Sequence, residues 1–247
     1  KSMVFQGRNA YMAIQVVVGI IHINMSILDK LVAVVAPHNC LSCSKEGSLL
    51  CRSCFPELGA VVPDRCFRCN KLSADSKTCS SCRRMSKLSY VWIRSKYAGI
   101  PKELVHRLKY ERSFTASTII AEAMVRVLPH KLENYIIIPI PTASSRRRQR
   151  GYDQSVLIAR HISRLTTLPM RQHLVRLGQS RQVGSKKADR ISQLKDAYMV
   201  IHGNELLGKR ILLIDDVMTT GATLECAAKI MRSVGVKRVD ALVFARA

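Results

Sequence analysis

The chain has 247 residues, 47% of them hydrophobic, which is enough for one ordinary domain plus a small module and argues against a disordered protein. Its 40 lysines and arginines outnumber 17 acidic residues; the net charge of +23 predicts a polyanionic partner such as nucleic acid, an anionic membrane surface or a phosphorylated metabolite, with general basicity that aids solubility as the alternative. Aromatic residues make up 5%, which argues weakly against a protein that stacks many bases.

Residues 1–36 form an apolar lead. The apolar stretch at 11–23 is too short to span a bilayer, which takes about 20 apolar residues, and we find no secretory signal. Residues 25–36 have the spacing of a short amphipathic helix, with Ser26 as its N-cap and Pro37 ending it. We therefore expect no transmembrane segment and a reducing, cytoplasmic location.

Cysteines are concentrated in residues 37–88, a segment with little apolar material that contains eight of the nine. They form four C-x-x-C pairs, each of which places two thiolates on one tight turn, so that two pairs complete a tetrahedral site. The segment is therefore predicted to bind one or two Zn²⁺ ions through Cys40, Cys43, Cys51, Cys54, Cys66, Cys69, Cys79 and Cys82. Sequential pairing of the turns needs the shortest loops and is preferred over crossed pairing.

Other cysteine chemistry would be an iron–sulfur cluster, disulfides or redox-active thiols, but the regular spacing favours zinc. The sites are predicted to be structural because no histidine or glutamate that could activate water is interleaved with the cysteines. Metal binding would then supply the folding free energy of this coreless segment. Its basic side chains either contact DNA or a protein partner or form a solvated face, and both interpretations stay open.

Residues 89–247 alternate predicted strands and helices. Apolar runs at 135–140, 210–214 and 238–244 are typical of buried parallel strands, whereas 153–165 and 223–233 have apolar residues at helical spacing. This alternation predicts an α/β domain with a parallel sheet and crossover helices. Cys226, in the second of these helices, is interpreted as a small core residue.

A phosphate-binding loop is predicted after the strand at 210–214. Asp215 and Asp216 lie at the carboxyl end of that strand, the edge where open parallel sheets bind ligands, and their acceptor oxygens suit two ribose hydroxyls. A glycine permits the tight turn, and the start of the next helix presents amides and a positive dipole end to a phosphate. The predicted ligands are Val217, Met218, Thr219, Thr220, Gly221, Ala222 and Thr223. The segment has neither the Gly-Lys-Ser/Thr of a Walker A loop nor a G-x-G-x-x-G fingerprint.

Residues 210–223 resemble the signature of type I phosphoribosyltransferases, in which an apolar strand, two acidic residues and a T-T-G-x-T loop bind phosphoribosyl pyrophosphate. From Met25 onward the chain resembles the ComF/GntX group of phosphoribosyltransferase-like proteins, which is associated with competence for DNA uptake. The landmarks are a short helix before the C-x-x-C pairs, Leu108-Lys109-Tyr110, Pro139-Ile-Pro141, Arg150-Gly-Tyr-Asp-Gln154, Arg176, Gln182 and Arg190. The chain departs from the group at Asp153 and Gln193, where asparagine is usual or frequent.

The resemblance implies a type I phosphoribosyltransferase-like fold in which a loop at 142–154 holds pyrophosphate. The implied ligands are Arg146, Arg150, Tyr152 and Gln154, although a solvated basic loop or a DNA-backbone contact would use the same arginines. Asp215 and Asp216 would be the catalytic residues, and Mg²⁺ would bind the diphosphate and ribose oxygens. The polar segment at 178–189 is interpreted either as a plain mobile loop or as a lid over the sugar.

Two functions follow from this resemblance. The first is a Mg²⁺-dependent phosphoribosyltransferase, or at least a protein that binds phosphoribosyl pyrophosphate or ribose 5-phosphate, linked to competence. The second is a non-catalytic protein that senses a nucleotide or binds single-stranded DNA in the same basic cleft, with a competence helicase-type protein as a further partner. The acidic pair and threonine loop favour the first, and the net charge and cysteine module favour the second.

Overall fold

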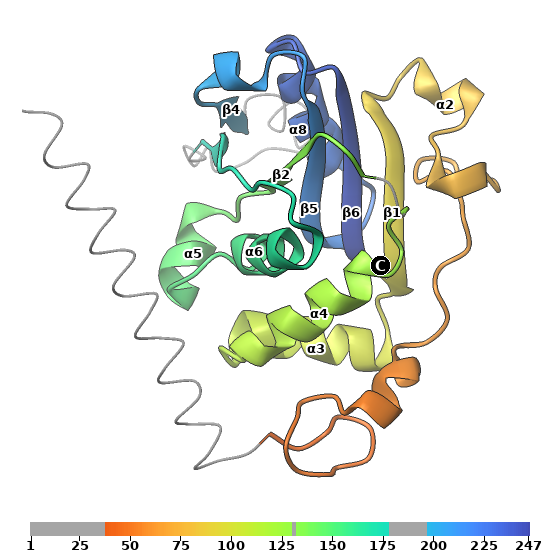
Figure 1. Ribbon diagram of the computed structural model, residues 1–247, viewed down its shortest axis with the longest axis vertical. Coiled ribbons are helices and arrows are strands. Elements are labelled where there is room, and N and C mark those ends of the chain that lie inside the picture. The colour runs from red at the N-terminus through yellow and green to blue at the C-terminus, as the bar shows by residue number, and fades with distance from the viewer. Residues whose placement is uncertain (1–37, 130–131, 178–196) are drawn as a thin grey trace, which may run out of the picture. The chain divides into compact units, whose positions relative to one another are not determined.

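The computed structural model describes residues 38–129, 132–177 and 197–247, which fall into two compact units, one ending at Phe55 and the other beginning at Pro56 (Figure 1). The helix expected at 25–36 and the loop or lid expected at 178–189 lie outside the described residues. The division between the units separates the first two C-x-x-C pairs from the last two. The expected boundary near residue 88 stays a prediction.

The described part of the first unit, residues 38–55, is organised by its cysteines. An antiparallel bridge between Asn39 and Glu46 closes the loop that contains the first C-x-x-C pair. The short 3-10 helix η1 (Arg52–Leu58) begins directly after Cys51 and contains Cys54.

The second unit is built on a four-stranded parallel sheet with the strand order β1-β6-β5-β2. Its strands are β1 (Leu88–Lys96), β2 (Tyr135–Pro139), β5 (Arg210–Met218) and β6 (Arg238–Arg246). The central strands β5 and β6 are mostly apolar, as is typical of strands that helices cover on both faces, and residues 211–214 have no exposed surface. The parallel sheet and the predicted strands are confirmed.

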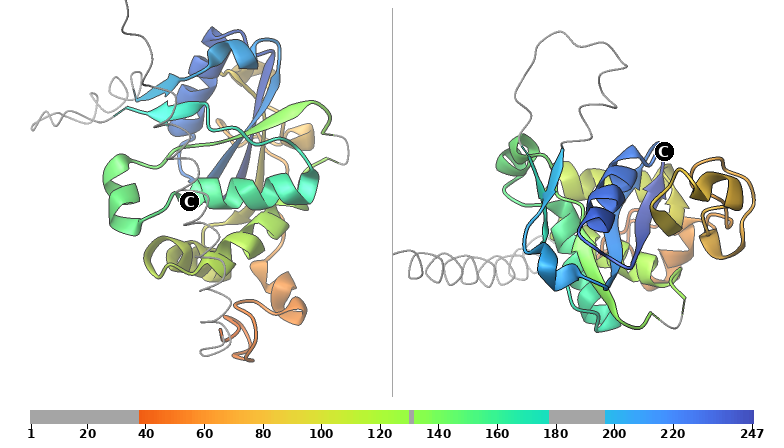
Figure 2. Two further views of the ribbon diagram at one scale, coloured as in Figure 1. Left: turned by 60° about the vertical axis from the view of Figure 1, so that its left-hand side comes forward. Right: turned by 90° about the horizontal axis from the view of Figure 1, so that it is seen from above.

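Helices lie on both faces of this sheet. The packed elements α3 (Gly99–Tyr110), α4 (Phe114–Val125) and α6 (Gln154–Thr166) contact one face, and α8 (Ala222–Ser233) contacts β1 and β6 from the other (Figures 1 and 2). The chain changes faces after α6, where a parallel bridge between Met170 and Ile137 extends the sheet beyond β2. After this bridge the chain moves back across the sheet, first to β5 and then to β6. Because crossovers between parallel strands are right-handed, this reversed direction puts α8 on the opposite face from α3, α4 and α6.

Smaller elements complete the second unit. They are η2 (Ala74–Ser76), α2 (Ser80–Arg83), α5 (Ser144–Arg150), η3 (Gly203–Leu206) and a two-stranded antiparallel sheet of β3 (Leu174–Arg176) and β4 (Tyr198–Val200).

Two predicted segments differ in the structure. Residues 144–150, expected as part of a basic loop, form α5, because arginine and glutamine are good helix formers; the helix ends at Gly151, whose φ is +84°. The strand expected to stop at residue 214 continues to Met218, because its backbone pairs with β6 as far as Arg246. The acidic pair therefore lies inside a strand, where the backbone fixes its position.

Candidate functional site

Asp215 and Asp216 point to opposite sides of β5, as successive strand residues do. Asp215 is partly exposed and its Oδ1 accepts a hydrogen bond from the Asp216 amide at 2.9 Å. Asp216 is 4% exposed, its Oδ1 accepts from the Val217 amide at 2.9 Å, and its Oδ2 forms an ion pair with the Lys109 ammonium. Although Asp215 keeps some exposed surface, the protein atoms packed around its carboxyl group exclude water from it, and this desolvation, followed by the charge of the adjacent Asp216, raises the pKa of Asp215 well above its ordinary value.

The loop after β5 has the geometry expected of an anion site. Thr219 and Thr220 are exposed, and Gly221 adopts the left-handed conformation with φ +78° directly before α8. The Ala222 amide lies 3.4 Å from Thr220 Oγ1, and the first amide bonded within the helix is that of Glu225, to the Gly221 carbonyl at 3.0 Å. The Thr223 and Leu224 amides lie between these two bonded amides in the first turn, which is where helices bind phosphate.

The remaining predicted loop residues contribute in other ways. The Met218 side chain is 3% exposed and belongs to the hydrophobic core, so it anchors the start of the loop and does not face a ligand. Val217 and Thr223 are half-buried at either end of the turn.

The 150–154 motif joins α5, α6 and the end of α3. Arg150 is 8% exposed; its Nη1 donates to Gln154 Oε1 at 2.9 Å, and its guanidinium lies 5.3 Å from the centre of the Tyr110 ring. The Tyr152 hydroxyl donates to the Leu108 carbonyl. These contacts fix the end of α3, which contains Lys109, beside the sheet edge.

Predicted ligands in this motif therefore differ in exposure. Arg150, Tyr152 and Gln154 are buried and engaged with other protein groups, whereas Arg146 is exposed on α5 together with Arg147 and Arg148. As substrate ligands all four stay predictions.

Asp153, which stands where the ComF/GntX group usually has asparagine, caps α6. Its carboxylate accepts from the Thr142 amide at 2.8 Å, the Thr142 hydroxyl at 3.0 Å and the Ser155 amide at 3.1 Å. All three partners donate, which a carboxylate with two acceptor oxygens satisfies and an amide with one accepting oxygen satisfies less completely. The loop that follows β2 is thereby tied to the start of α6.

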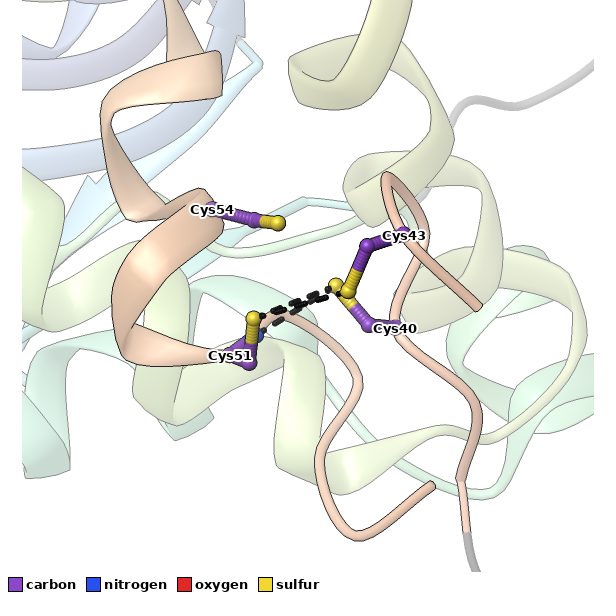
Figure 3. Close-up of side chains that lie close together, drawn as sticks. All are labelled: Cys40, Cys43, Cys51 and Cys54. Atoms are coloured by element: carbon purple, nitrogen blue, oxygen red, sulfur yellow. Dashed lines mark hydrogen bonds between the residues drawn. The ribbon is translucent and has the colours of Figure 1, made fainter. Parts of the chain in front are cut away.

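The eight predicted metal-ligating cysteines form two four-cysteine clusters, and within each the ligand atoms lie within 4.8 Å of one another. The first contains Cys40, Cys43, Cys51 and Cys54 (Figure 3), and the second contains Cys66, Cys69, Cys79 and Cys82. The sequential pairing of turns is therefore confirmed.

Sulfur distances in both clusters fit a tetrahedral metal. Cys51 Sγ is 3.7 Å from Cys40 Sγ and 3.8 Å from Cys43 Sγ, and Cys69 Sγ is 3.6 Å from Cys79 Sγ. Four thiolates at the usual zinc–sulfur distance would lie about 3.8 Å apart, whereas disulfide sulfurs lie about 2 Å apart. All eight thiols are free, so the clusters fit Zn²⁺.

The two clusters are structural repeats of one another. An antiparallel bridge joins Asn39 to Glu46 in the first and Arg65 to Leu72 in the second, at the same spacing from the leading cysteine. In each, a serine two residues after the third cysteine lies close to its sulfur, at 3.1 Å for Ser53 and 3.2 Å for Ser81.

Local hydrogen-bond donors favour the thiolate at some cysteines of each repeat, whereas the pKa of the fourth cysteine is raised. The pKa of Cys54 is raised to about 11, because the Ser42 hydroxyl lowers it less than the neighbouring thiols raise it, and that of Cys82 to about 12, first by burial and then by the Cys79 thiol. The backbone amides of Cys43 and then Cys51 lower the pKa of Cys40 to about 6. The Ser81 hydroxyl, and then the Cys82 amide, lower the pKa of Cys79 to about 6. Thiolate is the form that binds metal.

Comparison with known proteins gives one family and several relatives. The family model described as "Phosphoribosyl transferase domain" matches residues 120–247. "Competence protein F" of Haemophilus influenzae is 31% identical over 153 residues, covering 58% of this chain and 67% of the relative. "Competence protein ComFC" of Bacillus subtilis is 28% identical over 202 residues, covering 77% and 81%, respectively.

The chain belongs to the ComF competence protein family. "Competence protein ComFC" of Streptococcus pneumoniae, 25% identical over 206 residues, covers 81% of this chain and 89% of its own length. The ComF assignment made from sequence motifs is thus confirmed, as is the type I phosphoribosyltransferase-like α/β fold with two N-terminal four-cysteine clusters. None of the helices in the described part of this ComF protein is long and apolar enough to cross a membrane.

Some residues at the site were not singled out as ligands from the sequence. In the sequence Lys109 is only part of the Leu108-Lys109-Tyr110 landmark, because its ion pair with Asp216 joins residues far apart in the chain. The Thr142 amide donates to Asp153, and the Thr142 hydroxyl lies 3.0 Å from both Asp153 Oδ1 and Gln154 Oε1, whose acceptor oxygens share its one proton. The landmarks Gln182 and Arg190, and Gln193, where the chain departs from the group, lie outside the described residues.

Proposed function

We propose that this ComF protein binds phosphoribosyl pyrophosphate, or a related ribose 5-phosphate, at the carboxyl edge of β5. The observation that carries the proposal is the continuous arrangement of Asp215, Asp216 and the left-handed Gly221 before α8, within the segment that matches the phosphoribosyl transferase domain. Asp215 would hold the ribose hydroxyls, Asp216, which is buried against Lys109, would support it from the other side of β5, and the loop at 217–223 would hold the 5′-phosphate.

We further propose that the bound ligand reacts as in a phosphoribosyltransferase, with a nucleophile displacing pyrophosphate from C1. Mg²⁺, when bound with the diphosphate, would neutralise charge on the leaving group. The protein would contribute mainly positioning: Asp215 and Asp216 orient the ribose, Lys109 limits the negative charge of the pair, and Arg146 and Arg150 are the proposed pyrophosphate ligands.

Calorimetry with Mg²⁺ and phosphoribosyl pyrophosphate tests the binding step. The doubly substituted Asp215→Asn/Asp216→Asn protein should bind about 100-fold more weakly than wild type, because charge-assisted hydrogen bonds contribute about 1.5–3 kcal/mol each. The matched control is Glu103→Gln/Glu111→Gln, which changes the net charge equally at partly exposed positions and should bind normally. No binding heat for wild type would reject the proposal.

Phosphorus NMR separates a transferase from a non-catalytic binder. Pyrophosphate released from phosphoribosyl pyrophosphate in the presence of a nucleobase, and not by the Asp215→Asn/Asp216→Asn protein, would establish group transfer. Tight binding without any release would establish the sensing role instead.

Single-stranded DNA is the second proposed ligand, favoured by the net charge of +23 and by the exposed arginines 146–148 on α5. We propose that both ligands serve competence for DNA uptake, with a helicase-type protein as a further partner; the relatives' names, which contain the word competence, support the link to competence. Binding of a labelled oligonucleotide that survives the Asp215→Asn/Asp216→Asn change, and that weakens steeply with salt, would support this ligand.

We also propose that both four-cysteine clusters hold structural Zn²⁺. The sulfur spacing and the thiolate-stabilising donors described above support this assignment. Elemental analysis of purified protein tests it directly.

A further inference from the structure

The second cysteine cluster contacts the phosphate loop through its first C-x-x-C turn. Phe67, the residue after Cys66, is 1% exposed, and a Cβ built on Gly221 would lie 3.0 Å from Phe67 Cδ2. The phenyl ring thus lies directly against the left-handed glycine on which the predicted loop turns. The Phe67 carbonyl is held in turn by Arg246 Nη2 at 3.2 Å, from the end of β6.

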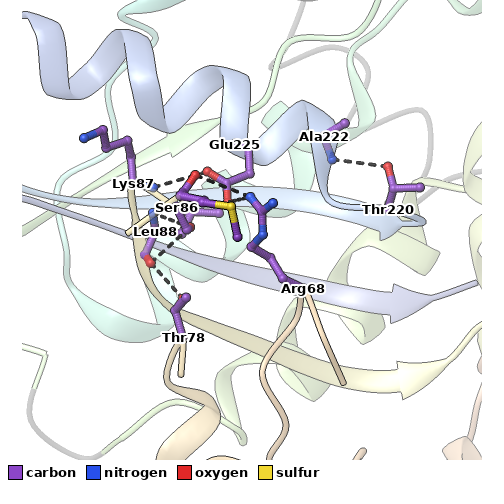
Figure 4. Close-up of polar contacts among 9 residues, drawn as sticks. Arg68, Thr78, Ser86, Lys87, Leu88, Thr220, Ala222 and Glu225 are labelled. Carbon is purple, nitrogen blue, oxygen red and sulfur yellow. Dashed lines mark hydrogen bonds and ion pairs between the residues drawn. The ribbon is translucent and has the colours of Figure 1, made fainter. Parts of the chain in front are cut away.

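Arg68, the next residue of the same turn, reaches the first turn of α8. Its Nη1 lies 3.2 Å from Glu225 Oε1, and the other oxygen, Oε2, accepts from the Lys87 amide at 3.2 Å (Figure 4). Only 12% of the Glu225 side chain is exposed. A buried carboxylate near a helix N-terminus competes with an incoming phosphate for the positive end of the dipole, so its neutralisation by Arg68 favours anion binding.

The first cluster provides an internal comparison. Because the two clusters are repeats, Leu41 and Ser42 occupy the positions of Phe67 and Arg68. Neither substitutes for its counterpart, since serine has no charge and leucine has no ring. The contacts with the phosphate loop therefore depend on Phe67 and Arg68 within the Cys66–Cys69 turn, and the C-x-x-C fold alone would not provide them.

We propose that the Cys66–Cys69 turn positions the phosphate loop, so that metal binding at the second cluster and phosphate binding at residues 219–223 strengthen each other. Phe67 supports the turn at Gly221, and Arg68 cancels the charge of Glu225. This inference rests on the proposed function, because it concerns the same phosphate site. Thermodynamic linkage requires the coupling to be reciprocal.

Affinity for ribose 5-phosphate, measured by calorimetry on zinc-loaded protein, tests the electrostatic part. Arg68→Ala should weaken binding about tenfold, within the range usual for coupled sites, and the added Glu225→Gln change should restore it, because the uncompensated charge is then removed. Phe67→Ala should weaken binding similarly, whereas the matched Leu41→Ala in the first cluster should not. Failure of Glu225→Gln to rescue Arg68→Ala would overturn the electrostatic argument.

Equilibrium competition for zinc with a colorimetric chelator tests the reciprocal direction. In a Cys40→Ser/Cys43→Ser background, which retains the second cluster, saturating ribose 5-phosphate should raise the affinity for zinc about tenfold. In a Cys66→Ser/Cys69→Ser background, which retains the first cluster, it should have no effect. Equal zinc affinity of the second cluster with and without ligand, while wild-type protein binds ribose 5-phosphate, would overturn the inference alone; absence of wild-type binding to both ribose 5-phosphate and phosphoribosyl pyrophosphate would overturn the proposed function with it.

Discussion

Gly221→Ala is the substitution for which the structure gives the most definite expectation. The residue has φ +78°, and its new Cβ would lie 3.0 and 3.1 Å from two Phe67 ring carbons and 3.4 Å from Met218 Sδ. The left-handed conformation costs a residue with a Cβ about 1–2 kcal/mol, and an overpacked contact costs about 1–3 kcal/mol more. We therefore expect the free energy of unfolding to fall by about 2–5 kcal/mol.

Urea denaturation of zinc-saturated protein measures this loss, and Gly208→Ala is its matched control. Gly208 has φ +70° but nothing within 4 Å of a built Cβ, so its substitution carries the conformational cost without the contact. The difference between the two variants, about 1–3 kcal/mol, isolates the contact with Phe67 and Met218.

A double substitution identifies the contacting side chain. Phe67→Leu shortens the residue that faces Gly221, so Gly221→Ala should cost less in that background, with a coupling energy of about 0.5–3 kcal/mol. If Gly221→Ala costs no more than Gly208→Ala, or if its cost is unchanged beside Phe67→Leu, the close packing beneath the loop is wrong.

Three further predictions follow from buried and cysteine-rich groups. Asp240 has no exposed surface and accepts hydrogen bonds from Tyr135, Arg238 Nε and the Tyr90 amide. Asp240→Ala should therefore lower the free energy of unfolding by about 3–5 kcal/mol, measured by urea denaturation. A loss below about 1 kcal/mol would contradict this prediction. Folding raises the pKa of Asp215, so above its unfolded pKa near 4 the ionised carboxylate opposes folding. Asp215→Asn should therefore raise Tm at pH 7, and this gain in Tm should disappear as the pH falls toward about 4. A Tm difference between the two proteins that does not change with pH would contradict this sign. Elemental analysis should find two Zn²⁺ per chain, and double-serine variants of either cluster should each retain one, whereas loss of both ions from either variant would show that the sites are not independent.

Short-range features were predictable from the sequence because they depend on spacing along the chain. The sequential pairing of the cysteines follows from the short loops between C-x-x-C turns, and the order strand, acidic pair, left-handed glycine and helix is contiguous from Arg210 to Ser233. The parallel sheet followed from apolar runs that only burial on both faces explains. The ComF family assignment rested on the same local motifs.

Features that depend on packing between distant segments came from the tertiary structure. The sequence does not predict the strand β1, since the buried Arg94 interrupts its apolar pattern; in the structure Arg94 Nη1 donates to the Gly59 carbonyl at 3.1 Å. The basic segment at 144–150 has an amino-acid composition compatible with either a loop or a helix, and the structure selects a helix.

The candidate phosphate site shows the same division. The sequence by itself determined its acidic pair and its loop, because those residues are neighbours in the chain. Only the tertiary structure brought Lys109 to Asp216, Arg68 to Glu225 and Phe67 beneath Gly221. Each of these contacts joins residues more than a hundred positions apart, and no local spacing encodes it: the sheet order and the helix packing decide which distant side chains meet.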